Sequence, residues 1–218
     1  MRLYSGSTTQ FVEDTYRNQI AEKLRLSFFK QFRFNPSDSE VVSWQNSLRA
    51  VSQVIEHNDL NDNGIILEYQ LPLTSKRLDA LLTGVNDDDI ENAVIIELKQ
   101  WGKCSSSTSP NEVVTFVGGN QREVLHPSVQ VGQYHQYLLD THTVFYENDP
   151  INLSSCSYLH NYHASENDVI YESKFDDWIN EYPLFTADDV VELSNLLKEK
   201  LDNGKGMDIL KKVEDSEY

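Results

Sequence analysis

The sequence of 218 residues lacks any long apolar run and has only two cysteines. No stretch approaches the roughly 20 apolar residues that a membrane-spanning helix needs, and the first ten residues, MRLYSGSTTQ, lack the apolar segment of a signal peptide. Cys104 and Cys156 are far apart in the sequence, which argues against a zinc site built on paired cysteines. We therefore expect a protein without membrane contacts that stays in the cytoplasm, a reducing compartment.

Basic residues are also scarce, because 18 lysines and arginines stand against 35 aspartates and glutamates, for a net charge of −17. A general nucleic-acid-binding surface is usually basic, so this balance argues against one. It still permits a locally positive groove, or a partner that supplies the affinity. The 39% hydrophobic content is typical of a folded globule. We expect a single domain over residues 1–201, followed by a polar tail over residues 202–218.

Apolar spacing predicts two helices near the N-terminus. Residues 8–30 carry apolar side chains at every fourth position, and Glu13, beside that stripe, is interpreted as a solvent-exposed acid. Ser37 and Glu40 then fit a capping box, and the 3–4 apolar spacing that follows predicts a second helix over residues 38–56. Glu40 is therefore interpreted as a capping residue and is no candidate for catalysis.

The middle of the chain alternates in the manner of strands. Three strands are expected in succession, then a helix that opens at His126-Pro127, then a fourth strand and a last helix. A helix between the third and fourth strands is a crossover, which is typical of a mixed sheet flanked by helices. The fold class is therefore predicted to be α/β. The expected strands are residues 64–69, 77–83, 93–98 and 156–162.

Charged residues on these strands are the candidates for chemistry. Glu97 and Lys99 are two positions apart on an otherwise apolar strand, so they share a face, and Asp79 on the preceding strand can approach Glu97. Two adjacent carboxylates repel each other unless a cation compensates, and Mg²⁺ takes oxygen ligands while keeping waters for phosphate chemistry. Lys99 could orient or activate the attacking water. An ordinary surface ion pair, with Asp79 bound to Arg77 or Lys76, remains the alternative.

These residues resemble a known motif. Asp79, seventeen intervening residues and then Glu97-Leu98-Lys99 are similar to the signature of the PD-(D/E)XK nuclease superfamily. The longer phrases EYQLPLTSKRLD, IELKQW, FVGGNQREVLHPS and YLHNY resemble the nuclease-like N-terminal domain that precedes Schlafen-type DNA/RNA helicases in bacteria. The resemblance covers about residues 3–200 and implies an αβββαβ restriction-endonuclease-like core, the order expected above.

The resemblance extends to the helix after the motif. Gln130-x-x-x-Tyr134 is similar to the Gln-x-x-x-Tyr motif of the RecB-like branch, and Gln133-x-x-x-Tyr137 fits the same pattern. We prefer Gln130, because it lies nearer the start of the helix. By the resemblance, Gln130 would orient the lysine or the water, and Tyr134 would contact the substrate backbone.

The resemblance also implies a metal site. Asp79 and Glu97 would bind Mg²⁺ or Mn²⁺, with the carbonyl of Leu98 as a further ligand, and Lys99 would serve the nucleophile. Glu68 remains open between two interpretations. It could be a third acid at the metal, as in some relatives, or it could pair with a basic residue across the hairpin.

Basic residues that could line a groove for phosphates are few. Arg77, Lys103 and Arg122 are the candidates, and ordinary surface charges are the alternative for each. The sequence departs from the superfamily in having Leu78, where a proline usually precedes the aspartate. No G-x-x-x-x-G-K-[ST] motif is present, so this chain carries no helicase ATPase site of its own.

The function expected from the resemblance is a metal-dependent nuclease that cuts DNA or RNA, in phage or mobile-element defence. One alternative is a catalytically inactive module of the same fold that binds nucleic acid, or a helicase or ATPase domain or subunit. Another is an interaction protein that uses its acidic surface, for example as a nucleic-acid mimic. The charge of −17 is the feature that keeps both alternatives open.

Overall fold

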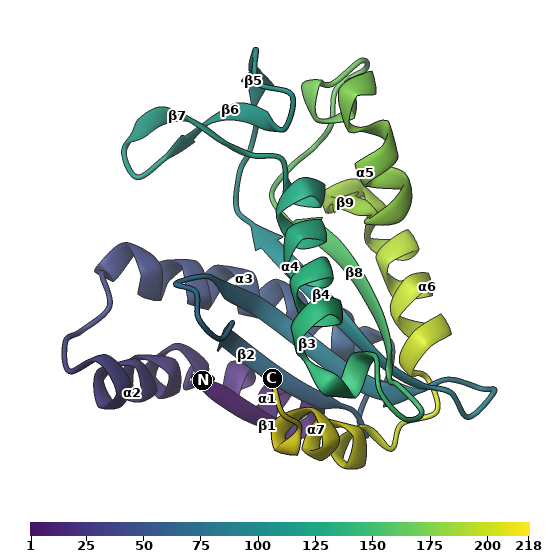
Figure 1. Cartoon of the computed structure of the whole chain (residues 1–218). Coiled ribbons are helices and arrows are strands. Elements are labelled where there is room, and N and C mark those ends of the chain that lie inside the picture. Colours follow the sequence, from purple (N-terminus) through teal and green to yellow (C-terminus); the bar gives the residue numbers. More distant parts are fainter.

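A computed structural model describes all residues of the chain, 1–218, and shows an α/β fold (Figure 1). A six-stranded mixed sheet has the strand order β1-β2-β3-β4-β8-β9, with antiparallel pairing up to β4 and parallel pairing from β4 onward. The predicted mixed sheet is confirmed. The predicted αβββαβ order is confirmed as well, in α3, β2, β3, β4, α4 and β8. The strands of this sheet are β1 (Tyr4–Ser7), β2 (Gly64–Gln70), β3 (Arg77–Val85), β4 (Glu91–Lys99), β8 (Asn152–Leu159) and β9 (Leu184–Thr186).

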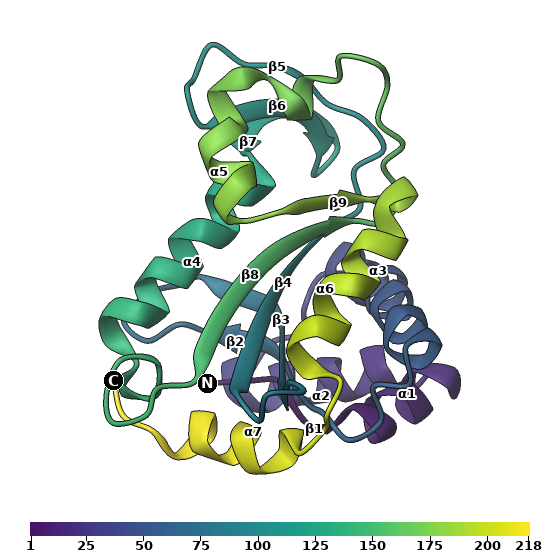
Figure 2. The ribbon, with the colours of Figure 1, turned by 90° about the vertical axis from the view of Figure 1, so that its right-hand side faces the viewer.

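Helices cover both faces of the sheet (Figure 2). One face packs against α1, α2, α3 and α6, and the opposite face packs against α4, α7 and the end of α5. None of the helices combines the length and apolar character that crossing a membrane requires. The helices are α1 (Thr8–Tyr16), α2 (Ile20–Phe32), α3 (Asp38–His57), α4 (Pro127–Thr141), α5 (Asp176–Glu181), α6 (Val190–Leu201) and α7 (Gly206–Asp215).

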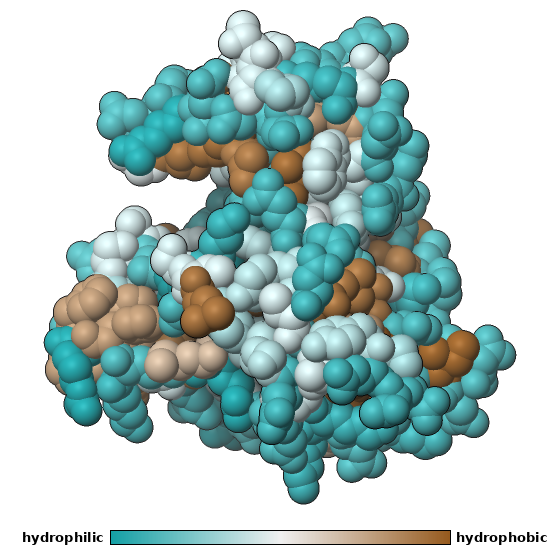
Figure 3. Space-filling view, viewed as in Figure 1, coloured by the Kyte–Doolittle hydropathy of each residue, from teal (hydrophilic) through white to brown (hydrophobic).

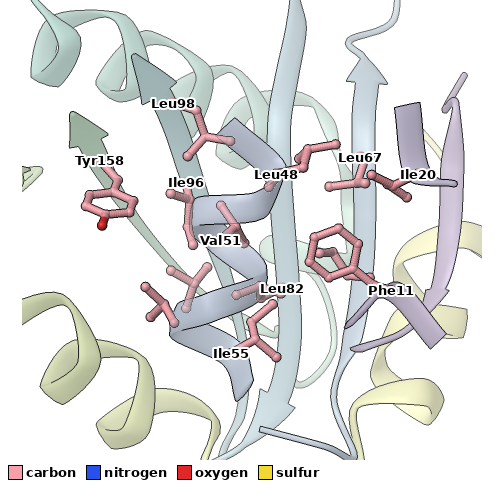
Figure 4. Close-up of a cluster of buried hydrophobic side chains, with 14 of the residues drawn as sticks. Phe11, Ile20, Leu48, Val51, Ile55, Leu67, Leu82, Ile96, Leu98 and Tyr158 are labelled. Atoms are coloured by element: carbon pink, nitrogen blue, oxygen red, sulfur yellow. The ribbon is translucent and has the colours of Figure 1, made fainter. Parts of the chain in front are cut away.

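The larger core lies between the sheet and α1, α2, α3 and α6 (Figure 4). Helix side chains such as Phe11 and Val51 meet alternate strand residues such as Leu67, Leu82 and Ile96, all at most 2% exposed. The strand residues between them face the second core under α4 and α7. Because both faces of the central strands are buried, a charged side chain on them must find its partners within the protein.

A second, three-stranded sheet projects from the body (Figure 1). We call residues 105–125 the arm, which comprises β5 (Ser105–Ser106), β6 (Glu112–Val117) and β7 (Asn120–Leu125). The tight turn between β6 and β7 uses Gly118 and Gly119 at φ of 58° and 83°, a left-handed conformation that favours glycine. A third core, including Trp101, Val113 and Phe175, joins the arm to the body.

The expected polar tail over residues 202–218 is wrong, because α7 packs against the sheet. Ile209, Leu210 and Val213 are at most 2% exposed and belong to the second core. The loop before α7 is also fixed, since Thr83 donates a 2.8 Å hydrogen bond to the carbonyl of Gly206. A Cβ atom on Gly206 would lie 2.2 Å from the backbone nitrogen of residue 64, so only glycine permits this approach. The domain therefore continues beyond residue 201.

Other boundaries also differ from expectation. The helix predicted over residues 8–30 is two helices, because Asn18 takes a left-handed φ of 57° between α1 and α2. Tyr16, assigned to the apolar stripe, is consequently 83% exposed. The fourth main strand begins at residue 152, before the predicted start at 156. The short edge strands β1 and β9 were not predicted, since they carry too few residues for a periodic pattern.

Candidate active site

Four polar side chains occupy one row across the sheet. The register of β2 on β3 sets Glu68 opposite Asp79, and continuing the register of β3 on β4 sets Asp79 opposite Glu97. Glu97 is in turn paired with Ser157 on β8. Neighbouring strands lie about 4.8 Å apart, so the predicted approach of Asp79 to Glu97 follows from the pairing of the strands.

The row is interrupted at Glu68, which has a left-handed φ of 52°. Leu67 and Tyr69 are two positions apart and should share a face, yet they belong to opposite cores of the molecule. This local reversal of β2 turns the Glu68 side chain toward α3, where the indole Nε1 of Trp44 donates a 2.8 Å hydrogen bond to its carboxylate. The Glu68 carboxylate is therefore bound by Trp44, although Glu68 and Asp79 still line one small cavity.

Asp79 is fixed where the ladder between β3 and β4 ends. The last backbone pair is Ala80 with Ile96, and the next amide in that direction, the N–H of Leu98, donates a 2.7 Å bond to the Asp79 carboxylate. Burial raises the pKa of Asp79, against the lowering effects of the Lys99 charge and of this N–H. The carbonyl of Leu98 points to the same side as its N–H, because both groups of a strand residue face one neighbour.

Glu97 and Lys99 form a direct ion pair, with 2.7 Å between Nζ and Oε1. The other oxygen of Glu97, Oε2, is buried and has no hydrogen-bond donor. Burial and then the charge of Asp79 raise the pKa of Glu97 to about 7, against the lowering effect of Lys99. Burial lowers the pKa of Lys99, but the charges of Glu97 and Asp79 outweigh it and the net shift is upward. Lys99 is therefore an ammonium group at neutral pH, and we call Asp79, Glu97 and Lys99 the Glu97 cluster.

A second group of charges lies beside it, and we call Glu40, Trp44, Glu68 and Arg77 the Arg77 cluster. The guanidinium of Arg77 is 3.2 Å from Glu68 and 2.5 Å from Glu40. Burial, followed by the charge of Asp79, raises the pKa of Glu68 to about 8, while Arg77 opposes the shift. Ser37 caps α3 as predicted, but the carboxylate of Glu40 binds Arg77 instead of completing a capping box.

Gln130 and Tyr134 meet near the acids. The amide of Gln130 donates a 2.9 Å bond to the Tyr134 hydroxyl, four residues later on α4. Burial raises the pKa of Tyr134, and the charges of Glu97 and Asp79 raise it further. Tyr134 is only 6% exposed, so it reaches a ligand only at the inner end of the site.

The alternative motif residues, Gln133 and Tyr137, point elsewhere. Gln133 accepts a 3.2 Å bond from Lys76, and the Tyr137 hydroxyl binds the carbonyl of Pro72. The geometry therefore favours Gln130 over Gln133 as the residue of the motif, in agreement with the choice made from the sequence.

The Glu97 cluster adjoins a cleft between the arm and the body through Leu98 and Lys99, which line it; the cleft is visible as the notch at the left of Figure 3. The cleft has a volume of about 940 Å³ and is lined by residues 98–103, residues 115–117, Gln121 and Ser43. A smaller cavity of about 40 Å³, which Glu68 and Asp79 line, shares Leu98 and Ser43 with the cleft. Lys103 lines the cleft, whereas Arg77 and Arg122 do not.

The donor set suits an oxygen-preferring cation, although its members are few. No three His, Cys, Asp or Glu side chains converge into one metal-binding group, because Glu68 is turned toward Trp44 and Arg77. Asp79, Glu97 and the carbonyl of Leu98 offer only oxygen atoms, and the unpartnered oxygen of Glu97 is the feature that a cation would satisfy. Mg²⁺ or Mn²⁺ bound by so few protein ligands would keep several waters.

Three residues of the site were not singled out from the sequence. Trp44 orients Glu68, Ser43 lines both cavities, and the buried hydroxyl of Ser157 has no partner beside Glu97. Of the three, only Ser157 could have been found from the sequence, because a fourth strand that runs parallel to the third must place one of its residues next to Glu97.

Comparison of the chain with protein-family models, with curated proteins and with solved structures found no match. Functional inference for this chain consequently rests on the geometry of the site and on its sequence motifs.

Proposed function

We propose that the chain is a Mg²⁺- or Mn²⁺-dependent nuclease that hydrolyses phosphodiester bonds in DNA or RNA. The observation that carries the proposal is the pair formed by Asp79 and the buried Glu97, one oxygen of which has no partner, beside the ammonium group of Lys99 that lines a large cleft. The similarity of Asp79 and Glu97-Leu98-Lys99 to the PD-(D/E)XK motif supports the same function.

Asp79, Glu97 and the Leu98 carbonyl would hold the metal ion, which would activate a water and offset charge on the phosphate. Lys99 lies at the boundary between the acids and the cleft, with its side chain 16% exposed and its Nζ 5.6 Å from the centre of the Trp101 ring. In the metal-free protein the charges of Glu97 and Asp79 raise the pKa of Lys99. As an ammonium group, Lys99 would donate hydrogen bonds and stabilise negative charge on the phosphate. Tyr134, held by Gln130, bounds the site on the side of α4.

A cleavage panel tests the proposal. Single-stranded and duplex DNA and RNA would be incubated with Mg²⁺, with Mn²⁺ and with EDTA, using wild type, Lys99→Met and Lys211→Met. Lys211 is an exposed lysine on α7 and provides a matched control. We expect cutting only with metal, loss of cutting in Lys99→Met, and unchanged cutting in Lys211→Met. Cutting in EDTA, or undiminished cutting by Lys99→Met, would contradict the mechanism.

A second candidate is a module of the same architecture that binds nucleic acid or a helicase partner without cutting. The binding of Glu68 by Trp44 and Arg77 favours it, since no three carboxylates converge and a metal would have only two of them. Calorimetric titration with Mg²⁺ and Mn²⁺ distinguishes the two candidates. Absence of metal binding, together with no cleavage of any substrate, would support the module.

A further inference from the structure

The cleft differs in charge from the chain as a whole. The protein carries 35 acidic and 18 basic residues, yet none of the residues that line the cleft is acidic and two are lysines, Lys99 and Lys103. Lys99 is ion-paired with Glu97, whereas Lys103 has no salt-bridge partner. Acidic residues elsewhere repel a polyanion, and Lys103, in a lining without acidic residues, attracts one locally. The cleft is therefore the part of the surface best suited to an anionic ligand.

An exposed aromatic ring forms part of the outer wall. Phe116 on β6 is 63% exposed and lines the cleft together with Gln121, its partner on β7. Its neighbours Val113 and Thr115 are at most 2% exposed, so β6 alternates and directs Phe116 away from the arm's own core. Figure 3 shows apolar surface on the underside of the arm, facing the notch, and hydrophilic surface on its upper side.

The arm is held in place against the body. The ammonium of Lys174 lies 2.7 and 3.0 Å from the carbonyl oxygens of Ser107 and Ser109 in the arm. Thr115 in the arm also donates a 2.8 Å bond to the carbonyl of Lys103, which precedes the arm in the chain. Phe116 is consequently presented on a fixed support, which reduces the ordering cost of binding.

We infer that the cleft binds single-stranded nucleic acid, with an unpaired base stacked on Phe116 and the backbone near Lys103, an inference that rests on the proposed nuclease function and specifies its substrate. Exposed aromatic rings in a positively charged groove are a recurring means of holding single strands, because every base has a face on which to stack. In a duplex those faces are covered by neighbouring base pairs. The strand would run from Phe116 inward, past Lys103, to the Glu97 cluster.

Binding can be measured without cutting, by fluorescence anisotropy of labelled oligonucleotides in EDTA at low salt. Single-stranded DNA, single-stranded RNA and duplexes of both would be compared, so that the preferred sugar is also identified. We expect single strands to bind at least tenfold tighter than duplexes. Phe116→Leu keeps an apolar side chain but loses the stacking face, and should weaken single-strand binding about 5- to 100-fold. Phe116→Trp should retain binding.

Matched variants elsewhere complete the design. Tyr146→Leu removes an aromatic ring that is 48% exposed outside the cleft, and Lys211→Gln removes a lysine outside it, so neither should change binding. Lys103→Gln should weaken binding and reduce its salt dependence. Equal affinity for duplexes, no binding of any strand, or unchanged binding by Phe116→Leu would overturn the inference.

The two functional assignments can fail separately. If single strands bind through Phe116 but the cleavage panel shows no cutting, the inference stands and the nuclease assignment falls. If duplexes are cut as fast as single strands and Phe116→Leu cuts at the wild-type rate, the nuclease assignment stands and the inference falls.

Discussion

The Glu97 cluster and the Arg77 cluster lie at the same end of the sheet and have the same formal composition. Each contains two carboxylates, one basic side chain and one neutral N–H donor, which is Leu98 for Asp79 and Trp44 for Glu68. They differ in access to solvent, since the Glu40 side chain is 27% exposed and the Glu97 side chain is 2% exposed. Each cluster nevertheless has one buried atom without a hydrogen-bond partner, which is the donor Nη1 in Arg77 and the acceptor Oε2 in Glu97.

This difference indicates which cluster performs chemistry. A buried and unpartnered carboxylate oxygen is costly unless it takes up a proton or binds a cation. The raised pKa of Glu97, about 7, reflects the first outcome in the metal-free protein. Formal charge does not separate the two clusters. The unpartnered atom does, because the carboxylate oxygen of Glu97 can bind a cation and the guanidinium nitrogen of Arg77 cannot.

The largest expected effect is on cleavage. Glu97→Gln keeps the shape of the side chain but removes a metal ligand, and should lower metal-dependent cleavage about 10³-fold or more. Glu40→Gln, the same change in the Arg77 cluster, should alter cleavage by less than about threefold. Initial rates on the substrate that the panel identifies would measure both, with circular dichroism to check folding. Equal losses in the two variants would remove the distinction between the clusters.

Much of the Glu97 cluster could be predicted from the sequence. The alternation of apolar residues on the third predicted strand put Glu97 and Lys99 on one face, and the short acidic turn before it implied a hairpin that brings Asp79 opposite. Strand pairing is a local consequence of such patterns. Gln130 and Tyr134 also lie on α4, which packs against β4, because a crossover helix returns over the strand that precedes it.

The Arg77 cluster could not be predicted in the same way. The orientation of Glu68 depends on a left-handed backbone at that residue. The sequence does not indicate this conformation, because position 68 is a glutamate and not a glycine or asparagine, which adopt it more readily. Glu40 was interpreted correctly as part of the start of α3, but its carboxylate is taken by Arg77. The helix α7 was missed although Met207, Ile209, Leu210 and Val213 lie at helical spacing, because the segment is short and charged residues stand between them.

A second expected effect concerns pH. A metal ligand must be deprotonated, and the pKa of Glu97 is raised from 4.5 to about 7. The apparent affinity for Mg²⁺ or Mn²⁺ should therefore rise about 100-fold from pH 5 to pH 8 and level off above the pKa. Calorimetric titrations at several pH values would measure it. Affinity independent of pH would show that Glu97 is already ionised in the metal-free protein.

The same shift has a consequence for stability without metal. A carboxyl whose pKa is raised by folding binds its proton more tightly in the folded state, so its contribution to stability is lost as pH rises from about 4.5 to about 7. Glu97→Gln cannot titrate, and in EDTA its melting temperature should increasingly exceed that of the wild type as pH rises through this range. A constant difference between the two proteins would contradict the assignment.

The smallest expected effect on cleavage concerns a change in the Arg77 cluster. Trp44→Phe keeps most of the apolar contact in the core but removes the N–H bond to Glu68, so the free energy of unfolding should fall by about 1–3 kcal/mol. Cleavage at a temperature where the variant is folded should change by less than about threefold, because Glu68 is held by the Arg77 cluster. Thermal unfolding and initial rates measure the two quantities separately. A loss of cleavage as large as that of Glu97→Gln would mean that Glu68 belongs to the metal site, and that Trp44 positions it there.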